Sequence, residues 1–126
     1  MILVDSDVLI AHLRGRSEAL EWMVRARQAG PLSISAVSVA ELAGGMRADE
    51  RTQVRRLLAS FRVAPVTTRI AWRASEFMRT YRRSHQGIGL ADYLLAGTAD
   101  TLGFELATLN VRHYPMLPRL KQPFPL

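Results

Sequence analysis

Short apolar runs alternate along the chain with longer segments in which apolar residues recur at helical spacing. Each run is three or four residues long and ends at polar residues or at a turn, which is typical of short buried strands. We expect these strands at residues 2–4, 32–35, 63–66 and 106–109. The longer segments predict helices over 8–13, 18–29, 38–47, 68–83 and 90–102, with a further helix from Asp49 or Arg51 to Phe61.

Local signals mark where these helices begin and end. Ser17 is placed to cap the second helix. Ser38 and Glu41 match the capping-box pattern at the start of the third helix, and Gly103 ends the last one. Strands that alternate with helices predict an α/β fold with a parallel central sheet of four or five short strands flanked by helices. The 126 residues fit one domain, with a proline-rich tail over 115–126.

Composition excludes several classes of protein. The chain has no cysteine, so neither disulfides nor cysteine-based zinc sites are possible. The first residues carry acids and no basic segment, so we expect no secretory signal and a cytoplasmic protein. No apolar run approaches the roughly 18 residues of a membrane span, so we expect no membrane association.

The charge balance suggests a polyanionic partner. There are 17 basic and 11 acidic residues, which give a net charge of +6, and all basic residues except Lys121 are arginines. Guanidinium groups match phosphate oxygens well, which favours nucleic acid. A GC-rich genome would produce the same arginine content without any ligand, so charge alone leaves both interpretations open.

Four of the acids stand in apolar surroundings, unlike the other seven. They are Asp5, Asp7, Glu41 and Asp92. Each has a simple structural explanation: Asp7 or Ser6 could cap the first helix, Glu41 could complete the capping box, and Asp92 could favour a helix N-terminus. Taken together they suggest a site, because Asp5 and Glu41 follow two strands whose carboxyl ends meet at one edge of a parallel sheet. That Asp92 joins them there is a conjecture.

Carboxylates that converge must be neutralised. Two of them about 4 Å apart repel by roughly 4 kcal/mol at an effective dielectric near 20. Since no Lys or Arg lies within four residues of Glu41 or Asp92, either one acid holds a proton or a cation lies between them. Oxygen ligands favour Mg²⁺ or Mn²⁺. Such an ion on a basic protein points to phosphodiester hydrolysis by a metal-activated water. The histidines are not spaced as a metal triad and are expected to be structural or exposed.

Four segments of the chain resemble the motifs of PIN-domain nucleases, and in particular of the VapC toxins of bacterial toxin–antitoxin pairs. They are Ile-Leu-Val-Asp-Ser-Asp-Val-Leu-Ile at 2–10, Ser-Ala-Val-Ser-Val-Ala-Glu-Leu at 35–42, Leu-Ala-Asp-Tyr-Leu-Leu-Ala at 90–96 and Leu-Ala-Thr-Leu-Asn-Val-Arg-His-Tyr at 106–114. The resemblance implies a PIN-like domain over 1–126 that acts as a Mg²⁺-dependent endoribonuclease, with Mn²⁺ as a possible substitute. It also implies that Asp5 and Asp92 bind the metal and that Glu41 completes the acidic cluster, as a catalytic residue and a further metal ligand.

The chain departs from this pattern after the fourth strand, where many PIN domains have a further acid. Here the segment has Asn110 and His113. Asn110 could orient a water or donate to a phosphate, but it is a poor metal ligand, so we expect one tightly held ion. Asp7 is additional to the three acids, and we expect it either to cap a helix or to support the metal ligands from outside.

The resemblance also implies partners: an RNA substrate, a small cognate antitoxin that covers the active site, and a second copy of the chain in a homodimer. Two other functions remain open from the residues. Asp5-Ser6-Asp7 is also similar to the start of haloacid-dehalogenase phosphatases, although the only lysine, Lys121, lies in the tail. Alternatively, the chain is a non-catalytic basic RNA-binding module whose acids only cap helices.

Overall fold

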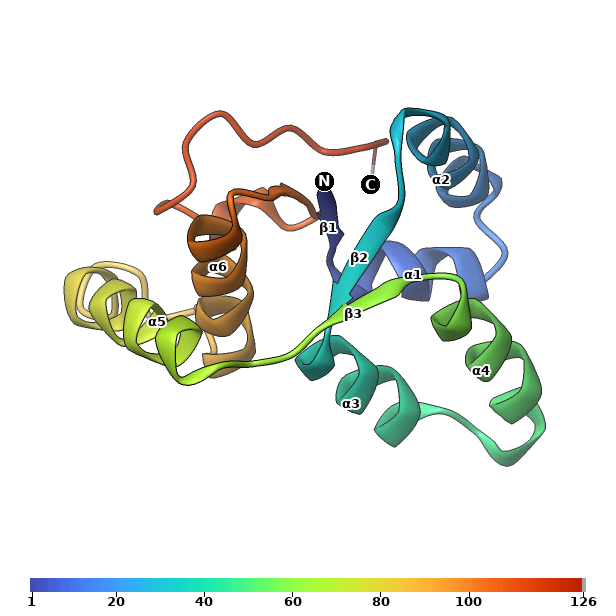
Figure 1. Cartoon of the computed structure of the whole chain (residues 1–126), viewed down its shortest axis with the longest axis horizontal. Coiled ribbons are helices and arrows are strands. Elements are labelled where there is room, and N and C mark those ends of the chain that lie inside the picture. The colour runs from blue at the N-terminus through green and yellow to red at the C-terminus, as the bar shows by residue number, and fades with distance from the viewer. Residues whose placement is uncertain (126) are drawn as a thin grey trace.

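The computed structural model describes residues 1–125 and has a four-stranded parallel sheet between two groups of helices (Figure 1). The strands lie in the order β3-β2-β1-β4. Their bounds are β1 Ile2–Val4, β2 Leu32–Ser35, β3 Arg62–Ala64 and β4 Glu105–Ala107. This arrangement confirms the predicted α/β class with a parallel sheet.

Within residues 1–125, six α-helices and the short 3-10 helix η1 connect the strands, and a second 3-10 helix, η2, follows β4. They are α1 Ser6–Leu13, α2 Ser17–Ala29, α3 Ala36–Gly45, α4 Arg51–Ala59, α5 Thr68–Tyr81 and α6 Leu90–Leu102, with η1 Ala48–Glu50 and η2 Val111–His113. In Figure 1, α5 and α6 lie on the left of the sheet and α1 to α4 on the right. None of the helices that the structure describes has the length and apolar character needed to cross a bilayer.

The alternation of side chains along β1 divides the core into two clusters. Val4 packs into a cluster formed mainly by α1 to α4, whereas Leu3 packs into a cluster with α5, α6 and β4. Both clusters depend on apolar residues that the sequence pattern places inside. The core therefore fixes the sheet edge from both sides, which determines where the strand ends point.

Several predicted boundaries are wrong by a few residues, and the caps explain why. Helix α3 begins at Ala36 because Ser35 is its N-cap, with its Oγ accepting from the amide of Val37 at 3.0 Å. Ser38 is therefore not a cap but a buried residue inside the helix. Ser17 is the first residue of α2 and Arg16 occupies the cap position. The third and fourth strands end two residues earlier than predicted, at Ala64 and Ala107.

Residues 115–125 of the proline-rich tail form no helix or strand and lie across the end of the sheet. Figure 1 shows the tail passing from the β4 side toward α2. Phe124 is buried in the core cluster of α1 to α4, and its ring lies 5.1 Å from the Arg16 guanidinium. The Arg16 side chain also donates to the carbonyl oxygen of Pro125 at 2.6 Å. The tail is thus attached to the helices rather than free.

Candidate active site

Asp5 is the centre of a group of acids at the carboxyl edge of the sheet. It follows β1 directly, and its amide donates to the carbonyl of Ala107 at 2.9 Å, so strand pairing fixes its backbone. Its carboxylate also caps α1, accepting from the amide of Ser6 at 2.7 Å. The expectation that Ser6 or Asp7 caps this helix is therefore wrong. Only 7% of Asp5 is exposed, which makes it one of the few buried charged residues.

Three hydroxyl groups join Asp5 to the other acids of the site. Thr108 Oγ1 lies 2.9 Å from Asp5 Oδ2 and 3.1 Å from Asp7 Oδ2. Tyr114 Oη lies 2.9 Å from Asp5 Oδ2 and 3.2 Å from Asp92 Oδ1. A hydroxyl has a single proton, so each of these two groups can fully donate to only one of its two carboxylates.

Glu41 and Asp92 reach this group from two different helices. The Oγ of Ser6 lies 3.4 Å from both Asp5 Oδ1 and Glu41 Oε1. Glu41 comes from α3 and is exposed, whereas Asp92 comes from the first turn of α6 and is partly buried. The structure thus brings Asp92 beside Asp5, as conjectured, and places Glu41 at the outer side of the group.

Asp7 and Asn110 differ in how they relate to the other acids. Asp7 Oδ2 accepts from the amide of Leu109 at 3.0 Å, while its Oδ1 is buried without a partner within residues 1–125. Asn110 is exposed, and its Nδ2 lies 3.4 Å from His113 Nδ1 rather than beside a carboxylate. His113 Nδ1 lies 3.0 Å from Asp92 Oδ2, so the Asn110 side chain reaches the acids only through this ring, while its amide donates to Thr108 Oγ1 at 3.1 Å.

Burial and mutual repulsion disfavour the charged forms of these acids. Burial raises the pKa of Asp5 despite the hydrogen bonds from Thr108 and Tyr114. Burial and the nearby Asp5 raise the pKa of Asp7 to about 6. The pKa of Glu41 is also raised, chiefly by desolvation and then by Asp5. A bound cation would reverse this situation, because it would compensate the charges that now repel one another.

The donor set fits a hard divalent ion that keeps part of its hydration shell. In the described part of the chain, no group of three or more His, Asp or Glu side chains is placed to hold a metal ion. Mg²⁺ does not need three such ligands, because it is commonly held by one or two carboxylates and several waters. Asp5 and Asp92, which contact one hydroxyl, fit that arrangement, with Glu41 reaching the ion through water.

Sequence reasoning missed the residues that connect the acids. Thr108, Tyr114 and His113 all lie within the segment 106–114, which was identified by its resemblance to a motif, but none of them was assigned a role. A polar residue directly after a strand, as Thr108 is, indicates the same sheet edge as Asp5 does. No comparable signal exists for Tyr114, since a tyrosine near the end of a core segment is usually explained by packing.

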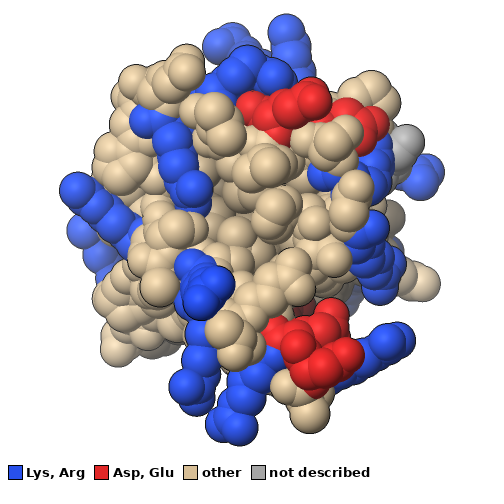
Figure 2. Space-filling view, turned by 90° about the vertical axis from the view of Figure 1, so that its right-hand side faces the viewer, with Lys and Arg blue, Asp and Glu red and all other residues tan. Residues whose placement is uncertain are grey.

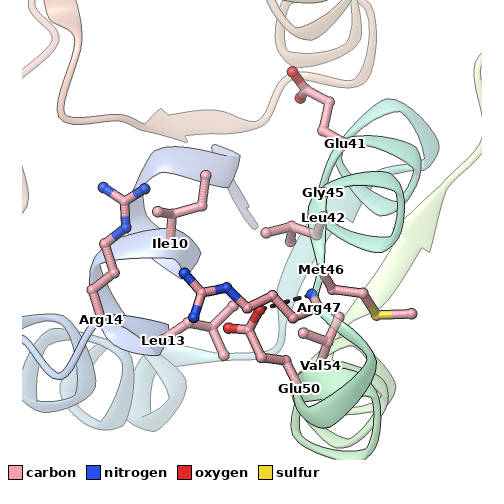
Figure 3. A pocket seen from close by; sticks show the side chains of 10 residues that line it. All are labelled: Ile10, Leu13, Arg14, Glu41, Leu42, Gly45, Met46, Arg47, Glu50 and Val54. Atoms are coloured by element: carbon pink, nitrogen blue, oxygen red, sulfur yellow. Dashed lines mark hydrogen bonds between the residues drawn. The ribbon is translucent and has the colours of Figure 1, made fainter.

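A groove of about 530 Å³ runs from Glu41 between α1, α3 and α4 (Figure 3). It is lined by Ile10, Leu13, Arg14, Glu41, Leu42, Gly45, Met46, Arg47, Glu50 and Val54. Figure 3 shows Arg14 on the α1 wall, with Glu41 at the end of the groove. The groove thus combines an apolar floor with arginines at its rim and adjoins the acidic group.

On the face of the molecule drawn in Figure 2, most of the charged side chains are basic. Figure 2 shows arginine side chains around much of its margin, two groups of acids near its upper and lower edges, and a largely uncharged centre. Among the large apolar side chains of the helices, Met23 and Phe77 are buried in the core. Trp72, by contrast, is 69% exposed.

Comparisons with known proteins agree with this fold. A family model described as the PIN domain matches residues 2–116. The chain is 65% identical to Ribonuclease VapC10 of Mycobacterium tuberculosis over 124 residues, which cover 98% of this chain and 93% of the relative. It is 34% identical to Ribonuclease VapC19 of the same organism over 125 residues, covering 98% of this chain and all of the relative.

Solved structures give the same result. A toxin–antitoxin complex from Klebsiella pneumoniae contains a chain that is 25% identical, with a TM-score of 0.80 and complete coverage of both chains. The DNA-bound VapBC of Salmonella typhimurium has the same fold, with a TM-score of 0.81 at 21% identity over 98% of both chains. The chain therefore belongs to the PIN-domain family, and within that family it is similar to VapC ribonucleases.

Proposed function

We propose that this chain is a metal-dependent endoribonuclease that acts as the toxin of a toxin–antitoxin pair. The observation that carries the proposal is the meeting of Asp5, Glu41 and Asp92, from three separate segments, around shared hydroxyls at the carboxyl edge of the sheet. Its high identity to a protein named Ribonuclease VapC10 supports RNA as the substrate. VapC ribonucleases with a PIN domain generally depend on a divalent metal ion.

Each of the three acids has a distinct part in this proposal. Asp5 and Asp92 would hold Mg²⁺, or Mn²⁺ in its place. When bound, the ion lowers the pKa of water and offsets negative charge on the phosphate oxygens. Glu41 is the most exposed of the three, so it is best placed to accept a proton from the attacking water. The amide and hydroxyl contacts of Asp5 keep its carboxylate in one orientation.

The alternatives explain less of the structure. The family match argues against a haloacid-dehalogenase phosphatase, since the PIN-domain model matches residues 2–116. The non-catalytic module predicts that the acids only cap helices. Asp5 does cap α1, and Asp92 accepts from the amide of Gly89 at 3.3 Å at the start of α6. Capping gives no reason for Glu41 to approach Asp5, because burial and then repulsion from Asp5 raise the pKa of Glu41 and so disfavour its charged form.

A small cognate antitoxin is the protein partner in this proposal. A solved neighbour of the same fold is described as a toxin–antitoxin complex. The groove between α1, α3 and α4 offers an apolar floor beside Glu41 on which a partner segment could cover the acids. We expect both proteins in the cytoplasm, where RNA is available. A homodimer remains a prediction.

The substitution Asp5→Asn tests the enzymatic function. Asparagine caps a helix as well as aspartate does, so the variant keeps the start of α1 while losing the charge that would hold a metal. Since even partners outside the ligand set cost about 10- to 100-fold, we expect RNA cleavage to fall by more than about 100-fold. Cleavage of a mixed RNA substrate with Mg²⁺, and with EDTA, measures this.

Asp49→Asn is the matched control, because Asp49 is exposed on η1 and lies outside the acidic group. It should cleave RNA at the wild-type rate. Cleavage by Asp5→Asn at that same rate, or wild-type cleavage that persists in EDTA, would refute a metal site at Asp5. A cooperative thermal transition confirms that each variant is folded.

A further inference from the structure

Tyr114 is held rigidly behind the acidic group. It follows η2, with its amide donating to the carbonyl of Val111 at 3.1 Å and its own carbonyl accepting from Leu117 at 3.1 Å. Only 2% of the residue is exposed, and its ring belongs to the core cluster that contains Leu3 and Leu106. Packing and backbone hydrogen bonds therefore fix the position from which its hydroxyl extends.

That hydroxyl lies between two acids that come from different elements. It contacts Asp5 Oδ2 at 2.9 Å and Asp92 Oδ1 at 3.2 Å. Among the hydrogen bonds of residues 1–125, no other side chain contacts both of these carboxylates. Burial and the two carboxylates raise the pKa of Tyr114, so its proton stays available for donation.

We propose that Tyr114 is a positioning residue that holds Asp5 and Asp92 at the spacing required for a shared metal ion. The inference rests on the proposed function, because it assumes that these two acids bind the metal. Asp5 belongs to the end of β1 and Asp92 to α6, and without a common partner their charges would push them apart. The hydroxyl contacts one oxygen of each acid and leaves the other oxygen of each in partly exposed contacts with Ser6 and His113.

Hydrogen bonds of this kind orient metal ligands in general. Carboxylates that bind a metal are themselves hydrogen-bonded, and loss of one such partner costs about 10- to 100-fold in metal affinity or activity. Thr108 also contacts Asp5, but its second partner is Asp7 rather than Asp92. Tyr114 is therefore the hydroxyl whose removal should separate the two proposed ligands.

Tyr93 provides a closely matched control in the same core cluster. It is likewise 2% exposed, but its hydroxyl has no hydrogen-bond partner in the described residues. Tyr114→Phe and Tyr93→Phe each remove one buried phenolic oxygen and keep the ring. The two variants differ in whether that oxygen contacts the acids.

The experiment is Mn²⁺ binding by calorimetry to the full chain after EDTA treatment, without RNA. We expect Tyr114→Phe to weaken Mn²⁺ binding by about 10-fold. Tyr93→Phe should bind like wild type. Because Tyr114 acts by holding Asp92 at a fixed spacing from Asp5, Tyr114→Phe should cause a smaller loss of affinity when Asp92→Asn is already present. If Tyr114 acted only through packing, the loss of affinity caused by Tyr114→Phe would instead add in full to the loss caused by Asp92→Asn.

The outcomes separate this inference from the function on which it rests. If the wild type binds no Mn²⁺, the proposed metal site fails and the inference fails with it. If the wild type binds and Tyr114→Phe binds equally well, only the positioning role is overturned. Equal weakening by both phenylalanine variants also overturns it, since loss of a buried hydroxyl would then suffice. Should Tyr114→Phe not unfold cooperatively, Tyr114→Met, a flexible apolar side chain without the hydroxyl, must show the same loss of affinity.

Discussion

Asp7 is the acid whose environment most clearly opposes its charge. One carboxylate oxygen accepts from the Leu109 amide and the Thr108 hydroxyl, while the other is buried without a partner among the residues described. Its pKa of about 6 lies well above the ordinary value of 3.8, because of burial and of Asp5 nearby. Folding therefore favours the protonated form of this side chain.

This shift predicts how stability depends on pH. With the pKa raised, the contribution of Asp7 is fully favourable below about pH 4 and is lost as the pH rises through about 6. Asp7→Asn removes that loss, so the metal-free variant should gain about 1 to 3 kcal/mol over wild type at pH 7. Near pH 4 the two proteins should be equally stable. Urea unfolding in EDTA at both pH values measures the difference.

Asp49→Asn again serves as the control, since Asp49 is exposed and should show no such dependence. If Asp7→Asn gains nothing at pH 7, or gains the same at pH 4, the charge of Asp7 does not destabilise the fold. Excess Mg²⁺ should reduce the gain, because a bound cation would offset the repulsion between Asp5 and Asp7.

At this scale the sequence indicates the acids but not their connections. Asp5, Glu41 and Asp92 are conspicuous because they are charged residues in apolar segments. Tyr114 and His113 are not, because a buried tyrosine and a single histidine each have common structural explanations. Which hydroxyl reaches which carboxylate depends on side-chain directions across segments more than 100 residues apart, as with Thr108 and Asp5.

The α5–α6 pair is the contact between elements that determines where Asp92 lies. Gly97 allows α6 to approach α5 closely: a Cβ added there would lie 2.9 Å from the carbonyl oxygen of Ile70 and 3.1 Å from the amide nitrogen of Ala74. Both of these neighbours are backbone atoms, which cannot move independently of their helix. Any side chain at 97 must therefore push the two helices apart.

Gly97→Ala should accordingly destabilise the protein by about 1 to 3 kcal/mol, the usual cost of overpacking a core. It should also weaken Mn²⁺ binding, because α6 carries Asp92. Gly44→Ala is the control: Gly44 is exposed in α3 and a Cβ there meets nothing within 4 Å. That change should be neutral or should stabilise by up to about 1 kcal/mol, as alanine favours helix. Chemical unfolding of both variants decides, and equal stability of Gly97→Ala and wild type would contradict the close contact.

Element positions follow from the sequence more readily than element ends do. The last long helix runs over Leu90–Leu102 as predicted, because an apolar segment ends at Gly103, which adopts the left-handed conformation with φ of 68°. Helix α3 was placed too late because two serines, Ser35 and Ser38, both fit a cap. Only strand pairing, which carries β2 through Ser35, distinguishes them. Local pattern cannot supply that tertiary information.

At the scale of the whole molecule, a basic protein surrounds an acidic group. The net charge is +6, and in Figure 2 basic side chains are spread around the margin of the face shown rather than gathered in one patch. A general positive field would attract RNA toward the protein. The arginine content alone does not show whether the positive charge serves to bind RNA or reflects compositional bias. The salt dependence of RNA affinity distinguishes these two explanations.

Asp5→Asn, which should bind RNA without cleaving it, allows that measurement. If three to five phosphates are contacted, affinity for single-stranded RNA should fall by roughly 20- to 100-fold between 50 and 200 mM salt.

Arg82 is the arginine to test, because it is exposed at the end of α5 and acts electrostatically on Tyr93, next to Asp92. Arg82→Ala in this background should reduce the slope of log affinity against log salt by about 0.7, as expected for one phosphate contact. Arg25→Ala, an equally exposed change on α2, should leave the slope unchanged. Binding that does not depend on salt, or equal effects of the two arginines, would mean that the positive charge does not guide RNA to the acids.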